Sequence, residues 1–335
     1  MTAARAQRSS SWPLYLVGAL IVVGVLAVVA WSVELPYIAY SAGPVADAAD
    51  AVVAEEVEIY PPKGELLMLT IVSQDINVFD AVIAGTDPSV DLIRKEAVRR
   101  PGETDEEYRN RVLEQMEDSN FISIQVALNR LGYVPEIVIT EVVSDVPAAE
   151  VLAPGDVVKA VDGVEIEEIE EVVPLIEAHE PGDVIVLQLE RDGEPLQVEV
   201  ELTERADEPG SPMVGVVLRR LVIPPFSLSI EEGDVGGPSA GLMHTLAVID
   251  VLSDGELTKG HVIAGTGTID LEGFVGPIGG IRQKVPAAEA AGASHILVPE
   301  GNYEEALTAE RDTIEIVPVG TIDDALAFLE KLDPA

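Results

Sequence analysis

A stretch of 25 residues without a charged side chain, from 9 to 33, limits the folds open to the start of this chain. Within it, Leu14 to Trp31 is nearly all Leu, Val, Ile, Ala and Gly, and a helix over the whole stretch reaches across the roughly 30 Å hydrocarbon core of a bilayer. Arg5 and Arg8 precede it, which by the positive-inside rule leaves the N-terminus in the cytoplasm. We therefore expect a cytoplasmic N-terminus over 1–12 and a transmembrane anchor over 13–33.

We therefore expect the protein in the cell membrane, with a single span and an extracytoplasmic body. A cleaved signal peptide is the alternative, because small residues near 39–42 could form a cleavage site. The apolar part of a signal peptide is usually only about 7–15 residues long, which favours the anchor.

The charge of the chain excludes several classes of partner. Its 60 acidic and 20 basic residues give a net charge of −40, which argues against binding nucleic acid. Cysteine is absent and only four histidines occur, so we expect neither a disulfide, a metal centre nor another cofactor. Adaptation to high salt and a simply well-solvated surface both stay open as reasons for the acidity.

The organisation of the ectodomain begins with residues 34–62, which are small, acidic and proline-bearing, and which we interpret as a linker. The next region, 63–131, combines a strand over 64–73 with a long helix that starts at a capping-box pair, Thr104 and Glu107. We expect this region to pack on the domains that follow. The mixture of strands and helices predicts an α+β fold.

Residues 132–205 show short strands around a single helix, with a hairpin turn at Asp192-Gly193. Three runs in this region resemble the PDZ domain of the bacterial protease-associated type: 142–149 (Val-Val-Ser-Asp-Val-Pro-Ala-Ala), 154–158 (Pro-Gly-Asp-Val-Val) and 161–163 (Val-Asp-Gly).

By this resemblance, a groove would accept an extended peptide as an added strand, with backbone amides holding a C-terminal carboxylate. We expect the carboxylate loop just before the first strand, at Leu131, Gly132 and Tyr133, although one glycine of the usual pair is missing there. A β-rich spacer that binds nothing is the alternative.

From residue 210 to 335 strands and helices alternate, and the chemistry gathers in a glycine-rich turn. Pro238 suits the first position of a helix, which places Ser239 in the first turn, where free amides and the positive helix end can hold an oxyanion. Lys284 lies 45 residues later. A lysine can deprotonate a serine only when burial lowers its pKa, and Ile281 and Val285 are compatible with such burial.

Three segments of this region resemble the proteolytic domain of Lon peptidase: 237–241 (Gly-Pro-Ser-Ala-Gly), 265–271 and 276–284. The resemblance implies a Lon-type α/β domain in which Ser239 is the nucleophile and Lys284 the general base. It implies further that Thr266 helps to hold the lysine. The supporting residues around the nucleophile would be Gly237, Pro238 and Ala240.

Two positions depart from the Lon pattern. Gly236 stands three residues before the serine, where many Lon proteins carry an acidic residue. Pro286 follows the lysine by two positions, so we expect the helix there to start late or to kink.

The order of anchor, PDZ-like domain and Lon-type domain resembles the bacterial PDZ-containing Lon-like proteases (YlbL-type). This implies a membrane-anchored serine endopeptidase that forms a homo-oligomer, such as a hexamer. Its substrates would be unfolded polypeptides or C-terminal tails. The chain contains no phosphate-binding loop of the form G-x-x-x-x-G-K-[S/T], so we expect cleavage without ATP.

Two other interpretations stay open. The glycines around Ser239 also fit the nucleophile elbow of an α/β-hydrolase, with Asp270 and His295 as acid and base in the required order. A non-catalytic, membrane-tethered PDZ adaptor on a protease-like scaffold is the second. We assign no role to His244.

Overall fold

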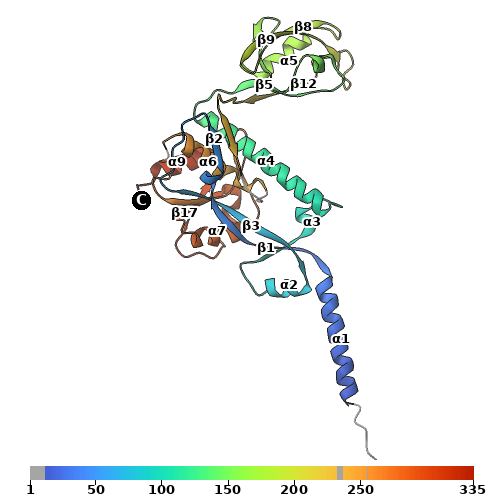
Figure 1. The fold of residues 1–335 in the computed structure, drawn as a ribbon, viewed down its shortest axis with the longest axis vertical. Helices are drawn as coiled ribbons and strands as arrows, with labels where there is room; N and C mark the ends of the chain where they lie inside the picture. Colours follow the sequence, from blue (N-terminus) through green and yellow to red (C-terminus); the bar gives the residue numbers. More distant parts are fainter. Residues whose placement is uncertain (1–11, 232–236, 255) are drawn as a thin grey trace, which may run out of the picture. The chain divides into compact units, whose positions relative to one another are not determined.

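The computed structural model describes residues 12–231, 237–254 and 256–335, which fall into two compact units. The first unit takes the described residues up to Val53, Ile59–Ser123 and the described residues from Ser229 onward; the second takes Ala54–Glu58 and Ile124–Leu228. Both units mix helices and strands (Figure 1), which confirms the predicted α+β class.

The described elements of the first unit are, in chain order, α1 (Trp12–Ser32), β1 (Glu34–Asp47), β2 (Val52–Glu55, at the boundary with the second unit), β3 (Glu65–Asn77), α2 (Val78–Ala84), β4 (Asp91–Arg94), α3 (Lys95–Val98), α4 (Asp105–Arg130, which continues into the second unit), β13 (Ser227–Ile230, at the boundary), α6 (Gly241–Leu252), β14 (Val262–Gly265), β15 (Thr268–Ile269), β16 (Val275–Gly276), α7 (Ile281–Ala290), β17 (His295–Pro299), α8 (Tyr303–Ala306), β18 (Glu315–Val319) and α9 (Ile322–Lys331).

The predicted transmembrane anchor over 13–33 is not supported by the structure. Across the part of the chain that is described, none of the helices has both the length and the apolar character needed to cross a membrane.

The first unit is built on a sheet of six described strands in the order β18-β17-β14-β3-β1-β4. The strands from β18 to β3 run parallel, and β1 is antiparallel to both of its neighbours. Helices α6 and α7 cover opposite faces (Figure 1): Ala264 of β14 packs in the core under α7, whereas the next residue, Gly265, approaches Met243 of α6. Residues 66–69 of β3 are buried on both faces, which explains their unbroken apolar run.

The linker predicted over 34–62 is wrong for its first half, because residues 34–47 form β1. This strand pairs with β3 from Glu34 opposite Asn77 to Asp47 opposite Leu67. Ile38 is 1% exposed. Its small residues and prolines give a weak strand signal in the sequence. Its pairing partner, β3, also comes only after an intervening turn and strand.

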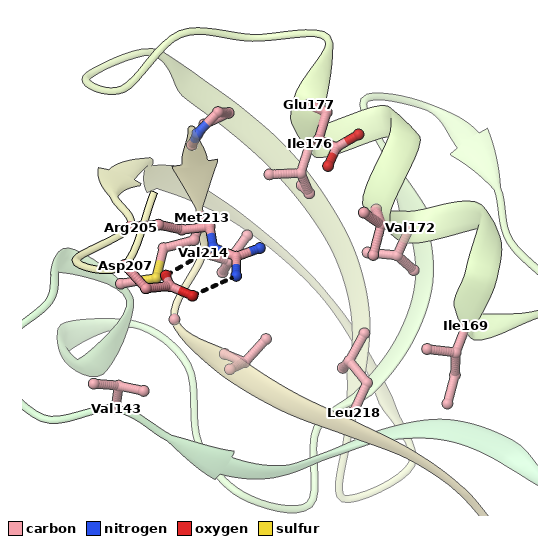
Figure 2. Close-up of a pocket in the computed structure, with 14 residues that line it drawn as sticks. Val143, Ile169, Val172, Ile176, Glu177, Arg205, Asp207, Met213, Val214 and Leu218 are labelled. Carbon is pink, nitrogen blue, oxygen red and sulfur yellow. Dashed lines mark hydrogen bonds and ion pairs between the residues drawn. The ribbon is translucent and has the colours of Figure 1, made fainter. Parts of the chain in front are cut away.

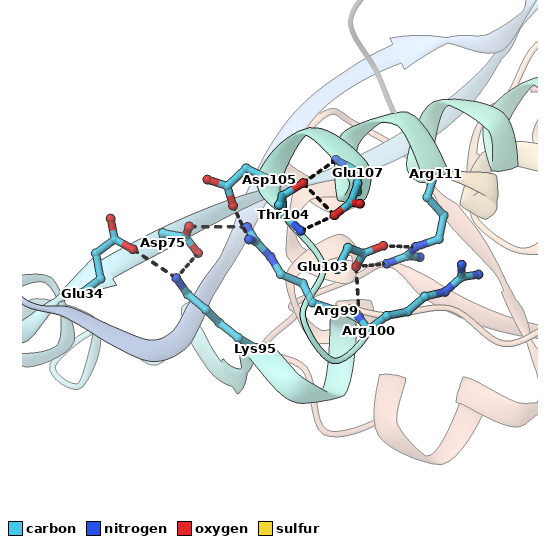
Figure 3. Close-up of polar contacts among 10 residues, drawn as sticks. All are labelled: Glu34, Asp75, Lys95, Arg99, Arg100, Glu103, Thr104, Asp105, Glu107 and Arg111. Atoms are coloured by element: carbon cyan, nitrogen blue, oxygen red, sulfur yellow. Dashed lines mark hydrogen bonds and ion pairs between the residues drawn. The ribbon is translucent and has the colours of Figure 1, made fainter.

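Charged side chains fasten α3 and the start of α4 to β3 (Figure 3). Asp75 of β3 pairs with Lys95 at 3.0 Å and with Arg99 at 3.4 Å. Arg111 of α4 donates two hydrogen bonds to Glu103, at 2.7 and 2.9 Å, and they lower the pKa of that carboxyl to about 2. Arg99 also pairs with Asp105 in the first turn of α4, so the start of this helix is linked to β3 through Arg99.

The start of α4 confirms the predicted capping box. The Thr104 backbone N–H donates to the Glu107 carboxylate at 2.8 Å, and the Glu107 N–H donates to Thr104 Oγ1 at 3.2 Å. These bonds satisfy two donors that the first helical turn would otherwise leave unpaired.

The second unit consists mainly of a twisted sheet with one short helix. Its elements are β5 (Glu136–Val142), β6 (Val157–Val161), β7 (Val164–Glu165), α5 (Val172–Glu177), β8 (Val184–Arg191), β9 (Glu194–Glu201), β10 (Thr203–Glu204), β11 (Pro212–Met213) and β12 (Val216–Leu221). The sheet order is β12-β5-β6-β8-β9, with β7 beside β6. Positive φ angles at Asp192 (52°) and Gly193 (79°) match the predicted hairpin turn.

The boundary predicted at residue 205 is too early for this unit. Strand β12 pairs with β5 along its whole length, so residues 216–221 belong to the same sheet. The single helix predicted here is α5, which is preceded by a 3₁₀ turn, Ile169–Glu171.

Candidate active site and peptide groove

The predicted nucleophile lies in a 3₁₀ turn, Pro238–Ala240, that leads directly into α6. Pro238 occupies the first position, as predicted. Gly237 has a φ of 103°, a conformation that residues with a Cβ rarely adopt. A Cβ at Gly241 would lie 2.9 Å from Ser119 Oγ, so only glycine allows α4 to approach this closely. Ser239 is half-buried.

The structure brings together three segments that are far apart in sequence. Lys284 Nζ lies 2.9 Å from Ser239 Oγ and 2.8 Å from Thr266 Oγ1. Lys284 projects from α7 with only 1% of its surface exposed, and its helix neighbours Ile281 and Val285 are fully buried. Serine, lysine and threonine therefore form one hydrogen-bonded cluster.

Burial changes the acid–base chemistry of the lysine. Removal from water penalises the ammonium form and lowers the pKa of Lys284 to about 7. A substantial fraction of the side chain is then a neutral amine near neutral pH. Such an amine can accept the proton of a neighbouring hydroxyl, which an exposed lysine cannot do at that pH.

Thr266 connects the lysine to the backbone of the nucleophile turn. It directly follows β14 and is fully buried. Its Oγ1 donates to the Ser239 carbonyl oxygen at 3.0 Å, and the Gly267 N–H donates to the same oxygen at 2.8 Å. Because the threonine proton is used in this way, its oxygen is left to accept from Lys284.

Of the two outcomes expected for the lysine helix, a late start or a kink, the late start does not occur. Helix α7 begins at Ile281, before the lysine, and contains Pro286 in its interior. Gly280, with a φ of 72°, precedes it, and the Lys284 N–H donates to the Gly280 carbonyl at 3.2 Å. Burial of the apolar face outweighs the single hydrogen bond that proline removes. Gly236, the other departure, lies outside the described residues.

The hydrolase alternative does not match the contacts of its two candidate residues. His295 contacts Ser294 at 2.8 Å and the carboxylate of Glu315 at 3.7 Å. Asp270 accepts a hydrogen bond from the Phe274 N–H at 2.8 Å in a surface turn. In the described part of the chain, the side-chain partner of Ser239 is Lys284.

The second unit contains a groove of about 410 Å³, shown in Figure 2. Its walls are α5, strand β12 and the segment before β12, and the apolar side chains of Val172, Ile176 and Leu218 point into it. Arg205 and Asp207, paired at 3.0 Å, lie at its edge.

The carboxylate loop predicted just before the first strand stays a prediction. Leu131, Gly132 and Tyr133 are not among the residues that line the groove, and the Tyr133 ring packs on Phe226 instead, at 5.8 Å. The groove residues that the sequence analysis did not single out include 212–216 and 218. A glycine directly before a short apolar run was the available signal, since Gly215 has a φ of 83° and directly precedes β12.

Comparisons with known proteins agree with this division. Residues 229–330 match the Lon protease (S16) C-terminal proteolytic domain family, and residues 115–202 match the PDZ domain family. The Lon protease of Campylobacter concisus is 42% identical over 105 residues, covering 30% of this chain and 13% of that protein. The archaeal Lon protease of Methanocaldococcus jannaschii is 37% identical over 108 residues, covering 32% and 16%. The chain thus spans less than a fifth of the length of these relatives.

Solved structures of PDZ domains each match about a quarter of this chain. The PDZ domain of an SdrC-like protein from Listeria monocytogenes is 27% identical, with a TM-score of 0.23, and the match covers 25% of this chain and 86% of that one. The corresponding domain from Listeria innocua is 24% identical, with a TM-score of 0.23, and the match covers 25% and 92%.

Proposed function

Since the chain combines a PDZ domain with a Lon-type C-terminal proteolytic domain, we propose that it is a serine endopeptidase with a Ser239–Lys284 dyad. One observation carries this proposal. A fully buried lysine, with its pKa lowered to about 7, lies 2.9 Å from a half-buried serine hydroxyl at the start of a helix. Perturbed titration together with this geometry is typical of an activated nucleophile.

The proposed reaction transfers one proton between Ser239, Lys284 and the leaving amine. Ser239 Oγ attacks the carbonyl carbon of the scissile peptide bond while its proton moves to Lys284 Nζ. The lysine then gives this proton to the leaving amine, and an acyl-enzyme remains. Water attacks the ester with Lys284 as base, which releases the acid and restores the serine. Thr266 keeps the amine oriented throughout.

The oxyanion of both tetrahedral intermediates needs preorganised donors. The amides of Ser239 and Ala240 lie in the first turn before α6, where backbone N–H groups point toward the helix start. We propose that these two amides stabilise the developing negative charge.

The proposed substrates are polypeptides with an extended segment. Strand β12 borders the groove and is an edge of its sheet, so a peptide can add to it as a further strand. The apolar walls favour tails with apolar side chains. Unfolded regions or C-terminal tails satisfy this requirement.

Three further properties are proposed from the sequence. ATP-independent cleavage is supported by the lack of a phosphate-loop motif in this chain. A homo-oligomer, such as a hexamer, is suggested by likeness to Lon-type domains, and sedimentation of the purified chain tests it.

Membrane attachment with an extracytoplasmic body rests on the uncharged stretch 9–33. Recovery of the native protein in the soluble cytoplasmic fraction would overturn that location.

The decisive experiment measures cleavage of an unfolded protein without ATP. We expect activity from the purified chain, and a loss of at least about a thousandfold in both Ser239→Ala and Lys284→Ala, because the dyad acts as a unit. Ser294→Ala and Lys331→Ala remove the same side chains elsewhere in the first unit and should keep activity. A folded wild type that cleaves nothing, with or without ATP, would support the non-catalytic adaptor instead.

A further inference from the structure

Two buried serines on one side of α4 contact the nucleophile turn, although they lie more than a hundred residues before it in sequence. Ser119 Oγ donates to the Pro238 carbonyl oxygen at 3.3 Å, and Ser119 is 5% exposed. Ser123 Oγ lies 3.0 Å from the Gly241 carbonyl oxygen, and Ser123 is fully buried. Neither serine belongs to the segments that identify the proteolytic domain.

These contacts act on whole peptide units. In a trans peptide the carbonyl oxygen and the following N–H point in opposite directions, so holding the oxygen also aims the N–H. The Pro238 oxygen shares its peptide unit with the Ser239 N–H. That oxygen accepts from both Ser119 Oγ and the Gly241 N–H.

The neighbouring peptide unit is held in the same manner. The Ser239 oxygen accepts from Thr266 and Gly267, and it shares its peptide unit with the Ala240 N–H. Both proposed oxyanion donors therefore belong to peptide units whose carbonyl oxygens accept hydrogen bonds from other segments. The donors that hold the peptide unit of the Ala240 N–H belong to the threonine segment. One of the donors that hold the peptide unit of the Ser239 N–H comes from α4.

We infer that Ser119 is a positioning residue for the oxyanion hole, because its hydroxyl holds the peptide unit that carries the Ser239 amide. Ser119 itself touches no reacting atom. The inference rests on the proposed peptidase function and deepens it, since it names a group outside the dyad on which the rate depends.

Two features make α4 a firm support for this contact. Its first turn is linked to β3 through Arg99, which pairs with both Asp105 and Asp75, and Arg111 fastens the helix to Glu103 of the preceding loop. Gly241 provides the space, because a Cβ there would lie 2.9 Å from Ser119 Oγ.

Ser123 offers a matched control. The Gly241 oxygen shares its peptide unit with the Leu242 N–H, which already donates to the Gly267 oxygen at 3.0 Å. That amide is not available to an oxyanion. Deleting the Ser123 hydroxyl thus removes a buried contact to the start of α6, together with its 2.7 Å hydrogen bond to the Ser119 carbonyl oxygen, without touching an oxyanion donor.

The test compares wild type, Ser119→Ala, Ser119→Thr and Ser123→Ala on a short fluorogenic peptide, and measures inhibition by a peptide aldehyde. The aldehyde adds to the serine and places a tetrahedral oxyanion in the site. For Ser119→Ala we expect kcat about tenfold lower, part of the 10²–10³ lost when an oxyanion donor is removed outright, with KM within about twofold. Aldehyde affinity should fall by the same factor, and the pH midpoint of the rate should stay in place. Ser119→Thr and Ser123→Ala should remain within about threefold of wild type.

Several results would overturn the inference. They are a Ser119→Ala rate equal to wild type, equal losses in Ser119→Ala and Ser123→Ala, or a lower kcat with unchanged aldehyde affinity. If thermal melting shows that Ser119→Ala does not fold, Ser119→Cys, which keeps the shape with a weaker donor, takes its place with the same criteria. A wild type that cleaves nothing overturns the proposed function and this inference together, whereas normal cleavage by Ser119→Ala overturns the inference alone.

Discussion

Lys284 lies with 1% of its surface exposed, and its amine is 2.8 and 2.9 Å from two hydroxyl oxygens. These surroundings, and not the residue type, decide its chemistry. Burial lowers the pKa to about 7, so the neutral base is available near neutral pH. The same burial destabilises the folded protein, because the unfolded chain keeps its lysine protonated in water. The burial that makes Lys284 a usable base therefore also lowers the free energy of unfolding.

Replacement of Lys284 by methionine should stabilise the protein in a pH-dependent way. Below pH 7 the amine is protonated in both states, so the wild type bears the full penalty of a buried charge. The penalty declines as pH rises from about 7 toward 10.5, where the unfolded state also loses its proton. We expect Lys284→Met to unfold with a free energy higher by on the order of 3 kcal/mol at pH 6, and by clearly less at pH 9.5. Urea denaturation at both pH values measures this gap.

Lys331→Met is the control for that measurement, because Lys331 is exposed at the end of α9. Its substitution should leave the free energy of unfolding unchanged at both pH values. A Lys284→Met advantage that stays constant or grows with pH would contradict the lowered pKa.

Among the elements, β1 shows how a strand without a strong sequence signal becomes part of the core. Strand β3 pairs with it between residues 34 and 47 with two register shifts, and β4 pairs with residues 37–40, so the sheet satisfies much of its backbone. Ile38 is 1% exposed and Tyr40 7% exposed, whereas most of the residues between them and the ends of the strand are less buried. The strand therefore contributes through pairing and a few buried side chains.

Ile38→Ala should destabilise the first unit by about 2–5 kcal/mol, because it leaves a cavity beside the sheet. Ile59→Ala removes the same atoms from a side chain that is 55% exposed, and its effect should be within about 0.5 kcal/mol. The midpoints of urea denaturation of the two variants measure this difference in stability. Equal effects would mean that residues 34–47 behave as the linker that the sequence suggested.

At the scale of the whole molecule, the two kinds of site belong to separate compact units. The serine–lysine cluster lies entirely in the first unit, and the apolar groove lies entirely in the second. Each can therefore be altered without removing a residue of the other. This separation predicts that recognition of a substrate tail and hydrolysis of a peptide bond respond to different substitutions.

Val173→Glu places a charge in the groove at a side chain that is already 53% exposed, so the fold should tolerate it. We expect KM for a protein with an apolar C-terminal tail to rise about tenfold, while cleavage of a short fluorogenic peptide stays unchanged. Val184→Glu, at an equally exposed valine outside the groove, is the control. Parallel losses on both substrates would show that the groove does not select tails.

The amino-acid sequence by itself determined the features that depend on neighbours a few residues apart. The capping box at Thr104, the turn at Asp192-Gly193 and the proline before Ser239 are of this kind, because their hydrogen bonds and φ angles are local. The motif segments also identified Ser239, Thr266 and Lys284 as candidates, although not their distances.

Only the tertiary structure decided the rest. The 2.9 Å contact and the burial that lowers the lysine pKa arise from α6, β14 and α7 meeting around one point. The pairing of residues 34–47 and the groove beside β12 likewise depend on partners distant in sequence. Burial and strand pairing are sums over such distant contacts, and a short window of sequence does not contain them.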